Sequence, residues 1–174
     1  MRKILAAALI SSVFATPAFA EGAEGSGFYG ALDTNTWSLS SKAPGQDNPS
    51  MGFRIAGGYH FTQNWGAELG YTQSGNGTIN GLDYHVESTQ LAAVGTYPLN
   101  DQFDLFGKLG VAANKLAGNA TGSKNDLLYG VGGQYNFNKQ VGLRLQYEDI
   151  GKVSDTPGYD SRVSNIALGL VYNF

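Results

Sequence analysis

Apolar and polar residues alternate along most of the chain, and a period of two is typical of β-strands. The last eleven residues show the alternation most clearly, because Ile166, Leu168, Leu170, Tyr172 and Phe174 share one face of an extended segment. The opposite face of this segment carries small and polar side chains. The same pattern predicts strands at residues 27–39, 51–61, 65–72, 82–97, 103–113, 126–137, 141–149 and 164–174.

The connections between these predicted strands alternate between short and long. Short turns are expected near Gln63, Asn100 and Lys139. The longer polar segments cover residues 40–50, 73–81, 116–125 and 150–161. Barrels that cross the bacterial outer membrane have short turns on the periplasmic side and longer loops outside. An even number of strands would then place both chain termini on the periplasmic side.

Aromatic residues on the apolar faces gather close to the predicted short turns. Phe28, Phe61, Trp65, Tyr97 and Phe137 lie at these strand ends, as do the two aromatic residues that close the chain. Aromatic girdles of this kind mark the lipid–water boundary of membrane barrels. We therefore predict an all-β fold, an eight-stranded antiparallel transmembrane β-barrel with an up-and-down meander topology. A soluble sandwich or lipocalin-like barrel would not need connections that are short at one end and long at the other.

The first twenty residues have the features of a secretory signal peptide. Arg2 and Lys3 precede a short apolar run, and Ala18-Phe19-Ala20 forms a small-residue cleavage site. The apolar run is too short for a membrane-spanning helix, which needs about 20 residues. The prediction is a signal peptide at residues 1–20, cleaved after Ala20, and an outer-membrane β-barrel domain at residues 21–174.

The composition of the mature chain argues against a nucleic-acid partner, disulfide bonds and a bound metal or cofactor. Once Arg2 and Lys3 are removed, nine basic residues face fourteen acidic residues, a net charge of about −5. This balance argues against nucleic acid as a partner. The chain has no cysteine, so disulfides do not stabilise it. Neither His60 nor His85 has a ligand-spaced partner, and we predict no metal and no cofactor.

With these features, the chain resembles the OmpA/OmpX class of small eight-stranded outer-membrane barrels. The resemblance covers essentially the whole predicted mature chain. Its individual motifs are degenerate, so their order and spacing carry the resemblance. The matching segments are residues 28–31, 65–71, 96–98, 108–110, 142–147 and the terminal strand.

The resemblance implies a location in the bacterial outer membrane, in contact with its lipids. It also implies that Tyr172 and Phe174 form an assembly signal, which periplasmic chaperones and the barrel-assembly machinery would read. Full-length OmpA proteins carry a further, peptidoglycan-binding domain in the periplasm. We do not expect that domain or a cell-wall tethering role here, because the sequence ends at the barrel.

Charged residues that alternate with the apolar faces are predicted to point into the barrel. Eight strands leave an interior that side chains fill, and a lone buried charge there would be very costly. Glu68 is expected to pair with Arg144 or Lys108, and the resembling family places the matching acid and arginine in an interior network. The predicted network comprises Asp33, Arg54, Glu68, Lys108, Gln134 and Arg144.

This interior network has two interpretations. We favour a static polar plug that holds the barrel shut and fixes its register. The alternative is a gated ion path that opens when the ion pairs switch partners. Val94 occupies a position where the family can carry a basic residue, so the network here is expected to be simpler or differently connected.

Some outer-membrane barrels modify lipids, and the outward face of residues 82–97 raises that question. His85 shares this face with Asp83, Glu87 and Thr89, which resembles a base beside an acid and a hydroxyl. The serine that deacylases of this size need beside the histidine is missing, because Val86, Glu87 and Ser88 follow it. We therefore predict no catalytic residues and no enzymatic activity.

The predicted function is a structural or surface-interaction role in the outer membrane. The long loops are the surfaces open to the outside, and connecting loops commonly carry binding, here of surface ligands in adhesion or recognition. A narrow, low-conductance pore is the alternative, and a lipid-modifying enzyme is a distant third.

Overall fold

The computed structural model describes residues 26–39, 51–79, 82–118, 122–152 and 162–174. The predicted signal peptide, all of the predicted loop 40–50 and parts of the other three predicted long loops lie outside these residues. Within the described ranges, the strands are β1 (Gly27–Leu39), β2 (Gly52–His60), β3 (Trp65–Gln73), β4 (Gly77–Ile79), β5 (Leu82–Pro98), β6 (Phe103–Gly118), β7 (Gly122–Asn136), β8 (Val141–Lys152) and β9 (Arg162–Asn173).

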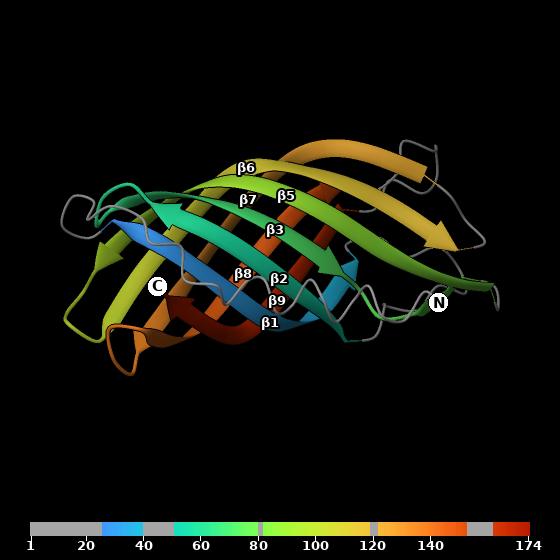
Figure 1. Ribbon diagram of the computed structural model, residues 1–174. Helices are drawn as coiled ribbons and strands as arrows, with labels where there is room; N and C mark the ends of the chain where they lie inside the picture. The colour runs from blue at the N-terminus through green and yellow to red at the C-terminus, as the bar shows by residue number, and fades with distance from the viewer. Residues whose placement is uncertain (1–25, 40–50, 80–81, 119–121, 153–161) are drawn as a thin grey trace, which may run out of the picture.

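Eight long strands form a closed antiparallel barrel, as the alternation predicted (Figure 1). Sequential strands are neighbours in the order β3-β2-β1-β9-β8-β7-β6-β5, and pairing of β3 with β5 closes the ring. The last strand returns to the first, so Leu32 on β1 lies opposite both Ile55 on β2 and Leu170 on β9. Closure satisfies the backbone of every wall strand, which a structure in lipid requires. The described residues contain no helix with the length and apolar character needed to cross a bilayer.

The structure differs from the prediction at the end of the barrel that carries the long connections. The predicted loop 73–81 contains the short strand β4, which pairs back onto β5 from Gly77 opposite Tyr84 to Ile79 opposite Leu82. Strands β6, β7 and β8 likewise extend into residues that were predicted as loops. A neighbouring strand supplies hydrogen bonds to backbone that is locally rich in Gly and Asn, and a local sequence pattern does not reveal that partner.

At the opposite end, each short turn uses one polar side chain to hold two backbone N–H groups. Thr62 Oγ1 accepts hydrogen bonds from the backbone of residues 64 and 65, at 3.3 and 3.1 Å. Asn100 Oδ1 accepts two such bonds at 2.9 Å, and Asn138 Oδ1 accepts two at 2.8 Å. These side chains accept hydrogen bonds from backbone N–H groups that have no partner strand at the turn. The chain can therefore reverse direction tightly between two long strands.

The outer wall is apolar along its length. Large residues that alternate along the strands are exposed, including Leu32 at 61%, Leu109 at 60% and Val131 at 63%. Exposed aromatic residues such as Trp65 and Phe137 lie near the short turns. A continuous apolar wall of this extent is unusual for a protein surrounded by water, and it is the surface that a lipid bilayer covers.

The interior has two apolar clusters near opposite ends. Tyr29, Ala31, Ala56 and Val171 form one cluster toward the end with the short turns. The second cluster, called the apolar seal below, lies toward the end with the long connections. It consists of Trp37, Val86, Ala92, Ala112, Leu128, Ile150 and Val163.

Candidate functional site

A cluster of buried charges occupies the interior, with Glu68 on β3 at its centre. The Glu68 carboxylate accepts hydrogen bonds from three cationic side chains on three other strands. Lys108 Nζ donates to Oε1 at 2.7 Å, Arg144 Nη1 donates to Oε2 at 2.9 Å, and Arg54 also donates to Oε1. Tyr29 adds a fourth bond, from its hydroxyl to Oε2 at 2.9 Å. The Glu68 carboxylate thus contacts residues as far as 76 positions away from it in the chain.

Two further acids complete the charged cluster. Asp33 Oδ2 lies 2.7 Å from Arg54 Nη1 and 3.5 Å from Arg144 Nη2. Glu148 Oε1 lies 3.2 Å from Lys108 Nζ and 3.7 Å from Arg54 Nη2. Three acids therefore face three bases, and their formal charges cancel.

Burial makes these contacts strong and interdependent. The six charged side chains are between 0% and 4% exposed to solvent. Removing one partner from such a set leaves the others buried without compensation, which costs several kcal/mol. The ring of Phe106 also lies beneath two of the cations, 5.4 Å from Lys108 Nζ and 5.7 Å from the Arg144 guanidinium carbon.

Two glycines make room for the aromatic rings beside the cluster. The Tyr29 ring lies where a Cβ on Gly58 would stand, and the Phe106 ring lies where a Cβ on Gly132 would stand. A larger residue at either glycine would push these rings from the positions that they occupy against the cluster. Small inward residues therefore help to position the long inward side chains of neighbouring strands.

The structure brings together all but one of the residues predicted for the interior network. Gln134 is the exception, because its amide donates to Asn136 at 2.8 Å and Asn136 donates to Asp104 at 2.6 Å, nearer the short turns. The predicted set lacked Tyr29, Gln146 and Glu148. The last two alternate with Arg144 along β8, which was a signal for their inward direction.

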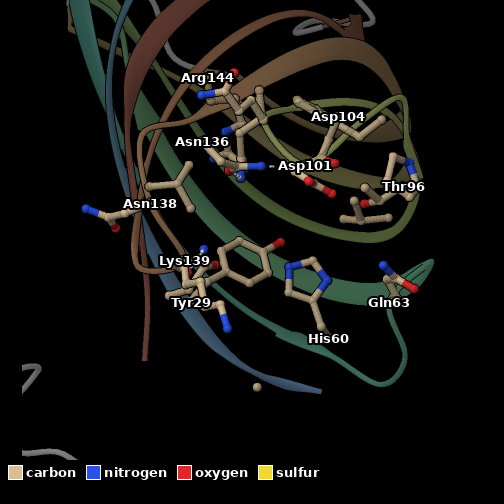
Figure 2. A pocket seen from close by; sticks show the side chains of 18 of the residues that line it. Tyr29, His60, Gln63, Thr96, Asp101, Asp104, Asn136, Asn138, Lys139 and Arg144 are labelled. Atoms are coloured by element: carbon tan, nitrogen blue, oxygen red, sulfur yellow. Dashed lines mark hydrogen bonds between the residues drawn. The ribbon is translucent and has the colours of Figure 1, made fainter. Parts of the chain in front are cut away.

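The space beyond Gln134 is a cavity at the end with the short turns, called the vestibule below (Figure 2). It has a volume of about 1080 Å³, and its mouth includes the turn residues Asn100 and Asn138. Arg144 lines it from within, so the charged cluster borders this space. His60 also faces it, with its ring stacked 4.7 Å from that of Tyr29.

Comparison with known proteins identifies the fold and its location. Residues 6–174 match the family described as outer membrane protein beta-barrel domain. The chain belongs to this family. Such barrels lie in the bacterial outer membrane, so the vestibule faces the periplasm and the long connections face outward.

Relatives in this outer-membrane barrel family include Outer membrane protein A. The protein from Escherichia coli O157:H7 is 26% identical over 152 residues, which cover 80% of this chain and 44% of the relative. The Serratia marcescens protein is 31% identical over 134 residues, which cover 67% of this chain and 37% of the relative. The chain thus spans less than half the length of these relatives. The predicted resemblance to OmpA-type barrels is confirmed.

Solved structures support the same fold. Neisserial surface protein A (NspA) superimposes with a TM-score of 0.66 and 22% sequence identity, over 87% of this chain and 100% of that chain. The attachment invasion locus protein Ail of Yersinia pestis gives a TM-score of 0.59 at 22% identity, over 86% of this chain and 97% of that chain. The predicted eight-stranded barrel is therefore confirmed, and the outer-membrane location follows from the family match and the relatives above.

The outward histidine on β5 has an acid beside it, but the nearest serine on the same strand does not share its face. His85 Nε2 lies 3.5 Å from Glu87 Oε1 on the outer face of β5. Ser88 points into the barrel instead, where its hydroxyl donates to Asn114 Oδ1 at 2.7 Å. The histidine and the nearest serine on its strand therefore lie on opposite sides of the wall. Among the described residues, no three His, Asp or Glu side chains gather to bind a metal ion.

Proposed function

We propose that this protein is a non-enzymatic component of the outer membrane, with a structural role and a surface-interaction role carried by its long loops. The observation that carries the proposal is the filled interior: a charged cluster and an apolar layer occupy the barrel between its two ends. A filled barrel offers no broad passage for solutes. Contact with other molecules then falls to the outer face and to the loops at residues 40–50, 73–81, 116–125 and 150–161.

A structural neighbour supports a ligand-binding role at the cell surface. Ail of Yersinia pestis has been crystallised in complex with the heparin analogue sucrose octasulfate, and it superimposes on this chain with a TM-score of 0.57. By analogy, we infer that the loops of this chain contact ligands outside the cell. Loops carry binding readily, because a rigid scaffold positions residues that are free to vary.

Exchange of the loops tests this role. We expect that bacteria displaying the protein attach to host cells or to other bacteria more than non-displaying cells do. Replacing residues 40–50 and 153–161 with Gly/Ser segments of equal length should abolish that gain, because the contacts lie in these loops. The matched control replaces the periplasmic turn residues Asn138 and Lys139 and should attach normally. Equal attachment by the loop variant, at equal surface level, would contradict the proposed role.

A narrow, low-conductance pore is the second candidate. Two observations favour it. The vestibule reaches from the periplasm to Arg144, and Glu68 lies among three cations, so its ion pairs could switch from one cation to another. A lipid-modifying activity is a distant third, since the serine on the strand of His85 and Glu87, Ser88, points into the barrel instead.

We also propose that the protein reaches the membrane by export and assisted insertion. The predicted signal peptide at residues 1–20 would direct export, and periplasmic chaperones with the barrel-assembly machinery would then recognise the terminal strand. Phe174 is 44% exposed, and its ring lies 5.1 Å from that of Tyr172. Both aromatic residues are therefore available on the outer face for recognition.

Replacing Phe174 with alanine is expected to lower the amount of folded protein in the outer membrane. The change removes the terminal ring, while the backbone bond from Phe174 N–H to the carbonyl of Phe28 is retained. Heat-modifiable migration on gels of outer-membrane fractions measures the folded amount. Phe137→Ala is the matched control, because Phe137 is also an exposed aromatic residue at the periplasmic end. Equal losses for both variants would refute a specific terminal signal.

A further inference from the structure

The barrel interior is asymmetric along its axis. From the periplasm, the vestibule leads to Arg144 and hence to the charged cluster. The apolar seal lies toward the outer end, where Trp37, Ile150 and Val163 sit close to the outer ends of β1, β8 and β9. Water and ions can therefore approach the cluster from one side, whereas the seal separates it from the cell exterior.

Polar side chains continue from the charged cluster toward the apolar seal. Gln90 lies beside Arg54, because a Cβ on Gly70 would meet both side chains, at 3.3 and 3.2 Å. Both amide atoms of Gln90 and of Asn165 are buried without a hydrogen-bond partner in the protein. Buried polar groups of this kind are commonly satisfied by water. The interior is thus chemically suited to water as far as the seal.

The apolar seal itself has a different character. Val86, Ile150 and Val163 are 0% exposed, and Leu128 is 1% exposed. Some polar neighbours of these residues use their groups within the protein, although Asn165, which pairs with Trp37 across β1 and β9, does not. Trp37 Nε1 donates to Asn35, and the Asn114 amide donates to the carbonyl of Ile150 at 2.7 Å. Apart from the Trp37 N–H, which is already used, the side chains of the seal present only hydrocarbon and offer no group to bind water or an ion.

We propose that the apolar seal, rather than the ion-pair cluster, is the permeation barrier of this barrel. The vestibule and the cluster then form a blind chamber that opens to the periplasm. Hydrophobic constrictions close pores by excluding water, so an ion that passed the charges would still be stopped at the seal. Opening of the ion pairs alone therefore leaves the barrel closed. This inference goes beyond the proposed surface role, and loss of loop binding would not affect it.

Single-channel recording in planar bilayers tests the position of the barrier. The seal variant Leu128→Ser/Ile150→Ser should gain discrete openings, because its hydroxyls allow water into the layer. The matched control, Val94→Ser/Val171→Ser, makes the same chemical change at buried apolar residues that line the vestibule, and it should stay closed. Glu68→Gln should stay closed as well. Two results would overturn the proposal. One is that Glu68→Gln opens while the seal variant stays closed, and the other is that the seal variant and the Val94/Val171 control open equally.

A second measurement does not depend on the seal variant folding. The chain has no cysteine, so Gln134→Cys provides a single thiol in the vestibule. In porin-deficient cells, a small charged thiol reagent should label it only after the outer membrane is permeabilised. Labelling should still require permeabilisation when Glu68→Gln is added. Labelling of intact cells in the Glu68→Gln background would place the barrier in the ion pairs and overturn the proposal.

Discussion

Replacing Glu68 with alanine is expected to lower the free energy of unfolding by about 3–5 kcal/mol. The change removes the carboxylate that joins Arg54, Lys108 and Arg144, all of which are buried. Asp33 and Glu148 then face three cations, so one positive charge stays buried without compensation. Equilibrium unfolding by urea in lipid vesicles measures the change.

The control for this prediction is an acid in a solvent-accessible pair. Glu87 lies 3.5 Å from His85, and both side chains are 29% exposed. Glu87→Ala should therefore cost about 1 kcal/mol or less, since screening weakens exposed pairs. A loss from Glu68→Ala no larger than that from Glu87→Ala would show that the cluster contributes little to stability.

Replacing Leu168 with arginine is expected to cost about 2–4 kcal/mol, the cost of a basic side chain near the middle of the bilayer. Leu168 lies midway along β9 on the outer face and is 46% exposed. The same unfolding measurement in vesicles applies. Ser38→Arg is the control, because Ser38 is also exposed but lies near the outer end of β1, where the expected cost is about 0–1 kcal/mol. Similar costs at both positions would contradict the assignment of the outer wall to lipid.

The direction of each side chain could be predicted from the sequence, but its depth in the barrel could not. Alternation placed both Gln134 and Glu68 inside. The structure puts Glu68 in the charged cluster and Gln134 in the vestibule, although Gln134 pairs with Arg144 in the β7–β8 register. Strands in a barrel are tilted and staggered, so side chains can meet inside without being paired across a ladder, as Glu68 does with Arg144. Asp33 and Arg54, by contrast, are ladder partners that also meet inside. One strand's pattern contains no information about that stagger.

The apolar seal was not predicted, and Ile150 shows why. The sequence placed Ile150 in a loop, whereas the structure places it at the end of β8 and fully buried. The pairing of β8 with β9 shifts between Asp149 and Lys152, and Gly151 adopts a positive φ of 73° there. Asp149 Oδ1 accepts the Gly151 N–H at 2.9 Å. Ile150 continues the inward alternation of Arg144, Gln146 and Glu148, and it was missed because the predicted strand ended at Asp149. The irregularity carries the strand on to Lys152, which strict alternation does not describe.

The strand limits near the short turns were predicted well for a related reason. Thr62, Asn100 and Asn138 signal a turn through their own side-chain hydrogen bonds, so the information is local. At the outer end, the limits depend on cross-strand pairs such as Gly77 with Tyr84, which the local sequence does not reveal. The outer ends of the strands, where the loops begin, were therefore predicted least accurately.

The closed interior is tested most directly by single-channel recording of the unmodified protein, refolded and shown to be folded by heat-modifiable migration. We expect no discrete openings over the voltage range that the bilayer tolerates, because the apolar seal lies across the path from the vestibule to the exterior. Reproducible openings of the unmodified barrel would contradict a closed interior. The narrow pore would then replace the surface-interaction role as the leading function.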